Sequence, residues 1–305
     1  MKIKIIYTLT AFVLLLSLSS FCQVKPEIKT KVVRLGGLPG LIEGVKIEDA
    51  EAAFKILTDS FVKGLKQKKG LNFDFTGKMY KNVSSLIEEL NSKKINYFYV
   101  SFIDYFKINN KGEYIPFLKG SRDGTDKFTN YILITNSGNQ ENQILNLHNT
   151  KISIPNSDDI NMGIYWIKTK LREELGEKEF KTIDFQQAQQ NESKLTLSVF
   201  FGKTDYALVT LHTYNLIAEL NPSIKSKIQI LAQSKPLATG IFAYRKGEEP
   251  ETVKAVRDVA LEIHQDLQGK QILNLFKSER LFEIFPADLK ESEIIINKYN
   301  QFFKQ

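Results

Sequence analysis

The residues of this sequence that could do chemistry are Ser157, Asp158 and Asp159, and the chemistry that they suggest is anion binding. The first backbone N–H groups of an α-helix have no partner within the helix and carry partial positive charge. A hydroxyl beside such amides forms a site for phosphate, sulfate or carboxylate. A plain helix cap without a ligand is the alternative, and the stretch by itself leaves both open.

These residues lie between a predicted strand and a predicted helix. Ile152–Ile154 is a short apolar run, and Pro155 ends it. From Ile160 to Leu175, isoleucine and leucine recur at steps of three and four, which predicts one buried face of an α-helix. Ser157 or Asp158 is expected to cap the N-terminus of that helix.

The rest of the chain alternates between strand-like and helix-like patterns. Helices are predicted over 48–69, 80–92, 195–200 and 253–267, and strands over 30–38, 71–75, 95–106, 131–135, 183–185, 206–211, 228–231 and 239–245. The polar stretch 109–130 is expected to be a connection between two lobes. Alternating strands and helices predict an α/β fold with largely parallel sheets covered on both faces.

Patterns typical of enzymes and metal sites are not found. His148, His212 and His264 are far apart and have no metal-ligand spacing to a carboxylate or to each other. Gly202–Thr204 resembles the end of a phosphate-binding loop, but the first glycine of that loop would be position 197, which is Leu197. Glu173 and Glu174 are predicted to lie on a solvated helix face. No catalytic residue, metal or cofactor is therefore expected.

The N-terminus has the composition of a secretory signal peptide, predicted over residues 1–22. Lys2 and Lys4 precede an apolar run that is too short for a stable membrane span, and small residues follow it. Cleavage after Cys22 would remove the one cysteine and lower the formal net charge from +7 to +5, because two lysines are lost. Lipid attachment at Cys22 is the alternative.

The positive charge of the remaining chain is dispersed along the sequence, so no nucleic-acid partner is expected.

Four passages in order carry a resemblance to a known family. They are an opening strand, a tyrosine–helix–aromatic-strand passage, a lysine-strand with a serine turn, and a valine–glycine–lysine–aspartate turn, in Val32–Pro39, Tyr80–Tyr105, Asn146–Ser157 and Val199–Ala207. Together they resemble the periplasmic solute-binding proteins of phosphate- and phosphonate-type ABC transporters. The resemblance covers nearly the whole chain after residue 22.

The resemblance implies a two-lobed type II periplasmic binding protein fold, each lobe a mostly parallel sheet flanked by helices. Lobe one is expected over 28–118 plus 235–305, lobe two over 128–222, and the hinge connections over 118–132 and 220–242. It also implies an extracytoplasmic protein that closes on a small anionic or zwitterionic ligand, such as a phosphonate or phosphate, and delivers it to an ABC transporter permease. Membrane attachment is expected only through lipid at Cys22.

The resemblance assigns ligand-binding roles to particular residues. Tyr80, Ser101 and Tyr105 would line the first lobe, and Ser157 with the amides of Asp158 and Asp159 would hold the anion from the second. The family's histidine position holds Glu192, whose carboxylate would repel a doubly charged phosphonate. Asp205 belongs to the last passage and is expected either at the site or tying down the turn before its strand. The carboxylates of Glu192, Asp158 and Asp159 favour a zwitterionic or amine-bearing phosphonate, or a non-phosphate ligand, over bare phosphate.

Two other functions remain open for the same fold. One is a sensing or partner-docking module that uses closure as a signal. The other is an enzyme related to the binding-protein-like enzymes of the menaquinone pathway, which would need a catalytic side chain in the cleft.

Overall fold

The computed structural model of the chain describes residues 30–38, 47–69, 73–108, 110–121, 126–139, 143–157, 160–275 and 278–304. The predicted signal peptide, Cys22, Asp158 and Asp159 lie outside these residues. Within the described ranges, no helix has the length and apolar character needed to span a bilayer.

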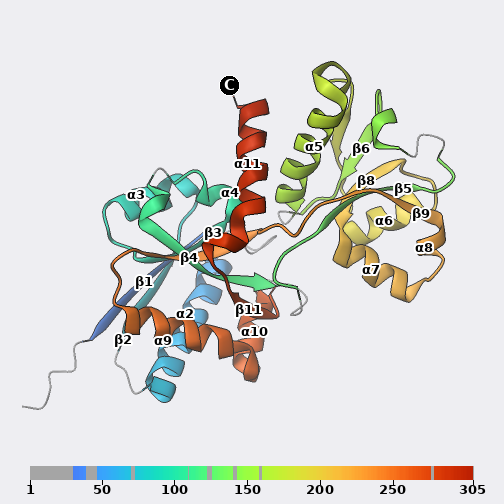
Figure 1. Cartoon of the computed structure of the whole chain (residues 1–305). Helices are drawn as coiled ribbons and strands as arrows, with labels where there is room; N and C mark the ends of the chain where they lie inside the picture. Colours follow the sequence, from blue (N-terminus) through green and yellow to red (C-terminus); the bar gives the residue numbers. More distant parts are fainter. Residues whose placement is uncertain are drawn as a thin grey trace, which may run out of the picture. The chain divides into compact units, whose positions relative to one another are not determined.

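The first sheet has six strands among the described residues, in the order β11-β4-β10-β3-β1-β2 (Figure 1). The strands are β1 (Lys31–Gly37), β2 (Phe73–Met79), β3 (Tyr97–Ser101), β4 (Tyr114–Ser121), β10 (Gly240–Arg245) and β11 (Arg280–Glu283). Strands β2 and β3 pair with β1 in parallel, whereas β10 and β11 pair antiparallel with their neighbours. The carboxyl ends of β1, β2 and β3 therefore meet at one edge of the sheet.

Helices cover both faces of the first sheet. Its helical segments are α2 (Ile47–Lys69), α3 (Val83–Asn91), α4 (Phe102–Tyr105), η2 (Lys111–Glu113), α9 (Pro250–Glu262), η5 (Ile263–Gln265), α10 (Leu267–Leu275), η6 (Pro286–Leu289) and α11 (Lys290–Phe303). Phe54, Leu57, Phe61 and Leu65 lie buried along one side of α2 and pack with α9 and α10 on one face of the sheet. The predicted apolar face of this helix is confirmed.

The second sheet has five strands among the described residues, in the order β7-β6-β8-β5-β9. They are β5 (Tyr131–Asn136), β6 (Lys151–Ile154), β7 (Asp184–Gln187), β8 (Tyr206–Thr210) and β9 (Ile228–Gln233), with the helical segments η3 (Ile144–Asn146), α5 (Asn161–Phe180), α6 (Glu192–Phe200), α7 (Leu211–Leu220) and α8 (Ile224–Lys227). Strands β6, β7 and β8 are parallel, and β5 runs against β8 and β9. Alternate side chains of β5 and β8 point to opposite faces, one covered by α5 and the other by α6, α7 and α8.

The chain passes between the two sheets twice, and the two crossing segments pair with each other. Thr129 and Leu237 form an isolated antiparallel bridge, with N···O distances of 3.0 and 2.9 Å. Just beyond it, Tyr131 N donates to Ser234 Oγ at 2.8 Å, and Ser234 N donates to Tyr131 O at 2.8 Å. The crossings lie inside the predicted hinge ranges 118–132 and 220–242.

The structure corrects several expectations. Residues 109–130 are more than a connection, because β4 lies within them and pairs with β10 and β11. The aromatic run 95–106 does not continue as one strand, since Ser101 ends β3 and opens α4. Strand β9 belongs to the second sheet, which therefore extends past the predicted lobe boundary at residue 222. Short polar or mixed strands such as β4 and β11 gain their stability from neighbours distant in sequence, so their local pattern is weak.

Close packing of α5 on the start of β5 yields the first testable prediction. A Cβ atom added at Gly163 would lie 2.5 Å from Cδ1 of Tyr131, whose side chain is fully buried. Gly163→Ala should therefore lower the free energy of unfolding by about 1–3 kcal/mol, although alanine favours a helix by about 1 kcal/mol over glycine. Denaturant unfolding measures the change. Gly112→Ala is the control, because nothing lies within 4 Å of its added Cβ, and equal stability of the two variants would contradict the packing.

Candidate functional site

The carboxyl edge of the first sheet brings together Tyr80 and Ser101. Gly37 at the end of β1 is level with Met79 of β2 and Tyr99 of β3. Tyr80 directly follows β2, and its backbone N donates to Gly37 O at 2.8 Å. Ser101 ends β3 two residues after Tyr99. The parallel strands thus place both predicted residues at one edge, as open α/β sheets do at their binding sites.

Ser101 forms a local network at the start of α4. Its Oγ donates to Asp104 Oδ2 at 2.8 Å and accepts from the backbone N of Asp104 at 3.0 Å. Lys107 Nζ lies 2.7 Å from the other carboxylate oxygen of Asp104. The serine hydroxyl therefore already donates to a carboxylate, and that carboxylate is also paired with Lys107.

The two predicted tyrosines of the first lobe, Tyr80 and Tyr105, are buried. The Tyr80 ring is buried, Lys78 Nζ lies 4.9 Å from its centroid, and burial raises the pKa of its hydroxyl. The Tyr105 hydroxyl donates to Lys111 O at 3.2 Å, and burial, followed by the charge of Glu293, raises its pKa to about 12. Both hydroxyls therefore stay protonated at neutral pH and can act only as neutral donors or acceptors.

The carboxyl edge of the second sheet carries Ser157. This residue follows β6, and its carbonyl accepts from Ile160 N at 3.4 Å. Helix α5 begins at Asn161, and Ile160 takes the N-cap position without a side-chain hydrogen bond. The predicted cap at Ser157 or Asp158 stays a prediction, because residues 158 and 159 lie outside the described residues. The loop after β7 lies beside Ser157, since Asn156 N donates to Gln190 O at 3.1 Å.

Glu192 lies at the same edge and is occupied by a partner within the protein. It is the first residue of α6, is 6% exposed, and its Oε2 accepts from Thr210 N at 2.9 Å and from Thr210 Oγ1 at 2.6 Å. Thr210 ends β8 and is the N-cap of α7. The carboxylate of Glu192 thus fills the position at the start of α7 where an external anion could otherwise bind.

Asp205 lies apart from the other predicted residues. It is exposed and immediately precedes β8, at the opposite end of that strand from Thr210. Its carbonyl accepts from Thr135 Oγ1 at 2.8 Å. The structure therefore places Asp205 in the turn before its strand, where its backbone carbonyl makes this bond, and the role of its carboxylate stays a prediction.

One carboxylate of α4 lies near α5. Burial, and then the carboxylate of Asp104, raise the pKa of Tyr165 in the second turn of α5. Asp104 also accepts a hydrogen bond from Ser101 Oγ, so the network at the start of α4 contains the charge that acts on Tyr165.

Sequence reasoning missed three residues of this arrangement. Asp104 stands three positions after Ser101, the spacing of a capping box, and that signal could have found it. Thr210 directly before a helix is an N-cap signal of the same kind. Tyr165 offers no local signal, because only the packing of α5 brings it near Asp104.

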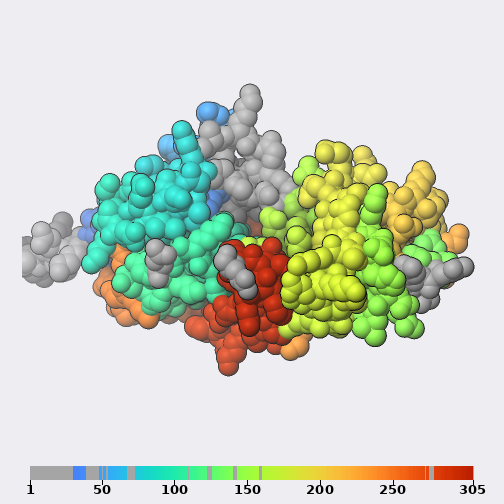
Figure 2. All heavy atoms as spheres, turned by 90° about the horizontal axis from the view of Figure 1, so that it is seen from above, coloured from blue at the N-terminus to red at the C-terminus, as the bar shows by residue number. Residues whose placement is uncertain are grey.

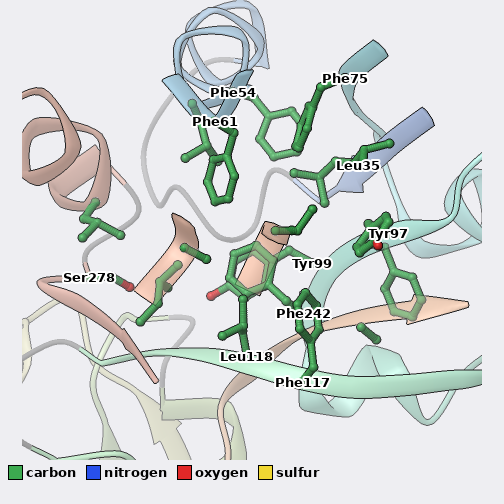
Figure 3. Close-up of a pocket in the computed structure, with 18 residues that line it drawn as sticks. Leu35, Phe54, Phe61, Phe75, Tyr97, Tyr99, Phe117, Leu118, Phe242 and Ser278 are labelled. Atoms are coloured by element: carbon green, nitrogen blue, oxygen red, sulfur yellow. The ribbon is translucent and has the colours of Figure 1, made fainter. Parts of the chain in front are cut away.

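An apolar cavity of about 40 Å³ lies on the face of the first sheet that α2 and α9 cover. Figure 3 shows Phe54, Phe61, Phe75 and Phe242 directed into it, with the Tyr99 hydroxyl on the side of Ser278. Transfer of an unpaired anion into such surroundings is strongly unfavourable, so this cavity is not a candidate for an anionic ligand. The described residues contain no group of three or more histidine, cysteine, aspartate or glutamate side chains that could hold a metal ion.

Comparison with known protein families gives one match, which covers most of the chain. Residues 49–289 match the model of the family described as "ABC transporter, phosphonate, periplasmic substrate-binding protein". No curated protein matches the chain.

Solved structures share the fold at low sequence identity. PhnD1 from Prochlorococcus marinus, in complex with methylphosphonate, is 15% identical with a TM-score of 0.55, over 89% of this chain and 99% of that one. A Xanthomonas citri protein bound to ATP is 13% identical with a TM-score of 0.58, over 89% and 98%. A putative sulfonate-binding protein from Methylobacillus flagellatus is 15% identical with a TM-score of 0.53, over 90% and 87%. At these identities the likeness concerns the fold alone.

The buried pair at the second edge yields a testable prediction. Thr210→Val keeps the shape of the side chain but removes the hydroxyl that donates to Glu192, so a buried carboxylate loses one of its two partners. We expect the free energy of unfolding to fall by about 1–3 kcal/mol, measured by denaturant unfolding. Thr76→Val, at an exposed strand position, should change stability by less than about 0.5 kcal/mol. A Thr210→Val protein as stable as the Thr76→Val control would show that the hydroxyl contributes nothing.

Proposed function

Because the chain belongs to the phosphonate family of periplasmic substrate-binding proteins of ABC transporters, we propose that it binds a small anionic or zwitterionic ligand of the phosphonate or phosphate type. Members of this family are extracytoplasmic components of importers and not enzymes, which removes the enzyme alternative. A small-molecule ligand and a membrane permease are the partners that this membership implies.

The observation that carries the ligand proposal is the position of two helix starts at the carboxyl edges of the two sheets. Ser101 precedes α4, and Ser157 precedes α5. The start of α7 is filled by the carboxylate of Glu192, whereas Ile160 supplies no side-chain acceptor to α5. The first-turn amides of α5 are therefore the donors proposed for the ligand's anionic group.

The charges around this place favour a ligand that carries an amine as well as an acidic group. Glu192 brings a buried carboxylate to the second edge, and Asp104 brings a carboxylate paired with Lys107 to the first. A doubly charged anion would be repelled by both carboxylates, whereas an ammonium group would be attracted. An aminoalkylphosphonate fits this arrangement better than phosphate.

Ligand capture is proposed to proceed by closure of the lobes about the paired crossing segments. The Thr129–Leu237 bridge keeps the two crossings together, so rotation is confined to few backbone bonds on either side. Closure excludes water, which strengthens each hydrogen bond to the ligand.

Export is proposed to depend on residues 1–22, with removal after Cys22. Lipid attachment at Cys22 is the alternative route, and it would tether the protein to the membrane surface near the permease. The mass of the N-terminal peptide from the mature protein distinguishes cleavage after Cys22 from a lipid-modified Cys22.

A thermal-shift panel tests the ligand proposal. Aminoethylphosphonate, methylphosphonate, phosphate and a sulfonate are each added to the purified protein. A ligand at about 100 times its Kd stabilises the folded state by about 2.7 kcal/mol, which raises Tm by roughly 5 °C or more. We expect the largest shift with aminoethylphosphonate and a smaller shift with phosphate.

Two serine variants locate the effect. Ser157→Ala should reduce the shift, while Ser137→Ala should not, because Ser137 follows β5 at the opposite edge of the same sheet. A panel without any shift would overturn the ligand class, and equal losses in both variants would overturn the placement of the site.

A further inference from the structure

Helix α11 is fastened at its beginning to both crossing segments. The backbone N of Ala238 donates to Ser292 Oγ at 2.7 Å, and Ser292 is only 1% exposed. Lys235 Nζ lies 2.6 Å from Glu291 Oε1. Asp288, just before the helix, pairs with Lys127 at 2.6 Å. The first turn of α11 therefore moves with the crossings that separate the two sheets.

The second half of α11 packs against α5, which covers the second sheet. The rings of Tyr299 and Tyr165 stack with centroids 3.8 Å apart and an interplanar angle of 19°. Lys298 Nζ lies 2.6 Å from Glu173 Oε1, and the rings of Phe303 and Phe180 are 5.3 Å apart. Figure 1 shows the two helices side by side, and Figure 2 shows their surfaces in contact from above. Glu173 is thus paired rather than simply solvated as the sequence predicted.

These contacts join elements of both lobes in one buried cluster. Helix α11 contributes Ile296, the first sheet contributes Phe98 and Ile241, and the second lobe contributes Leu133 and Trp166. Helix α5 also carries Tyr165. Its pKa is raised by burial and then by the carboxylate of Asp104 in the first lobe. The α11–α5 contact is therefore part of a buried cluster that joins the two lobes.

We propose that α11 is an interlobe strap: it is anchored on the crossing segments and holds α5, so that it favours the closed arrangement of the lobes before any ligand binds. Opening the hinge requires either separation of α11 from α5 or release of α11 from the crossings. The side chains of Tyr299 and Lys298 are partly exposed, so the strap biases the equilibrium without locking it. This inference is independent of the ligand proposed above.

The expected size of the bias follows from the contacts. Loss of a stacked aromatic pair corresponds to a two- to tenfold change in the ratio of closed to open molecules, in order of magnitude. The Lys298–Glu173 pair is about two-fifths exposed on both sides, so its loss changes the ratio by about fivefold or less.

Distance measurement between two spin labels tests the strap without ligand. The labels are placed on exposed residues of the two lobes, Asn91→Cys in α3 and Lys225→Cys in α8, in a chain that carries Cys22→Ser. Tyr299→Ala is expected to give a longer and broader distance distribution than the parent. Tyr299→Phe keeps the ring and should match the parent, as should Ile294→Ala, whose side chain is 45% exposed on the same helix.

A charge exchange provides a second, independent test. Lys298→Glu should lengthen the distance, and Glu173→Lys in the same chain should restore it, because the ion pair is rebuilt with its partners exchanged. Circular dichroism verifies that each variant is folded. If Tyr299→Ala does not fold, the charge exchange alone tests the strap. Unchanged distances in folded Tyr299→Ala, or no restoration by Glu173→Lys, would overturn the strap.

Discussion

The structure depends on the pairing of its two crossing segments. Thr129 and Leu237 exchange two backbone hydrogen bonds. Beside them, Tyr131 N donates to Ser234 Oγ and Ser234 N donates to Tyr131 O, so the two antiparallel segments are paired over several residues. Paired strands satisfy the polar backbone in a place where the chain leaves one core for another. They also join the segment that follows β4 to the segment that follows β9, between two sheets that are each built from discontinuous pieces of sequence.

Charge rather than shape distinguishes this chain's candidate site. Each edge combines hydroxyls with a carboxylate that already has a partner: Asp104 with Ser101 and Lys107, and Glu192 with Thr210. In the second lobe, an internal carboxylate satisfies the start of α7, whereas the start of α5 is the place proposed for the ligand's anionic group. In the proposed site, these acidic groups would direct an external anion to the start of α5 and would disfavour ligands with high negative charge.

The sequence was sufficient for the elements with strong internal patterns. The apolar face of α2, the strand–turn–helix around β6 and α5, and the apolar strands β5 and β8 are confirmed. It failed where a segment is defined by distant partners: β4 within a polar stretch, β11 near the C-terminus, and the position of β9 in the second sheet. The site divides in the same way, because Ser101 and Ser157 follow strands that are visible in the sequence, whereas the approach of Tyr165 to Asp104 results from tertiary packing alone.

The central claim is that one ligand is held from both carboxyl edges at once. Hydrogen exchange of the backbone amides tests it most directly, with aminoethylphosphonate added until calorimetry shows saturation. The account predicts that peptides covering residues 99–106 and 155–164 both exchange more slowly in the presence of the ligand. Slower exchange in only one of the two peptides, or in neither at saturation, would contradict it.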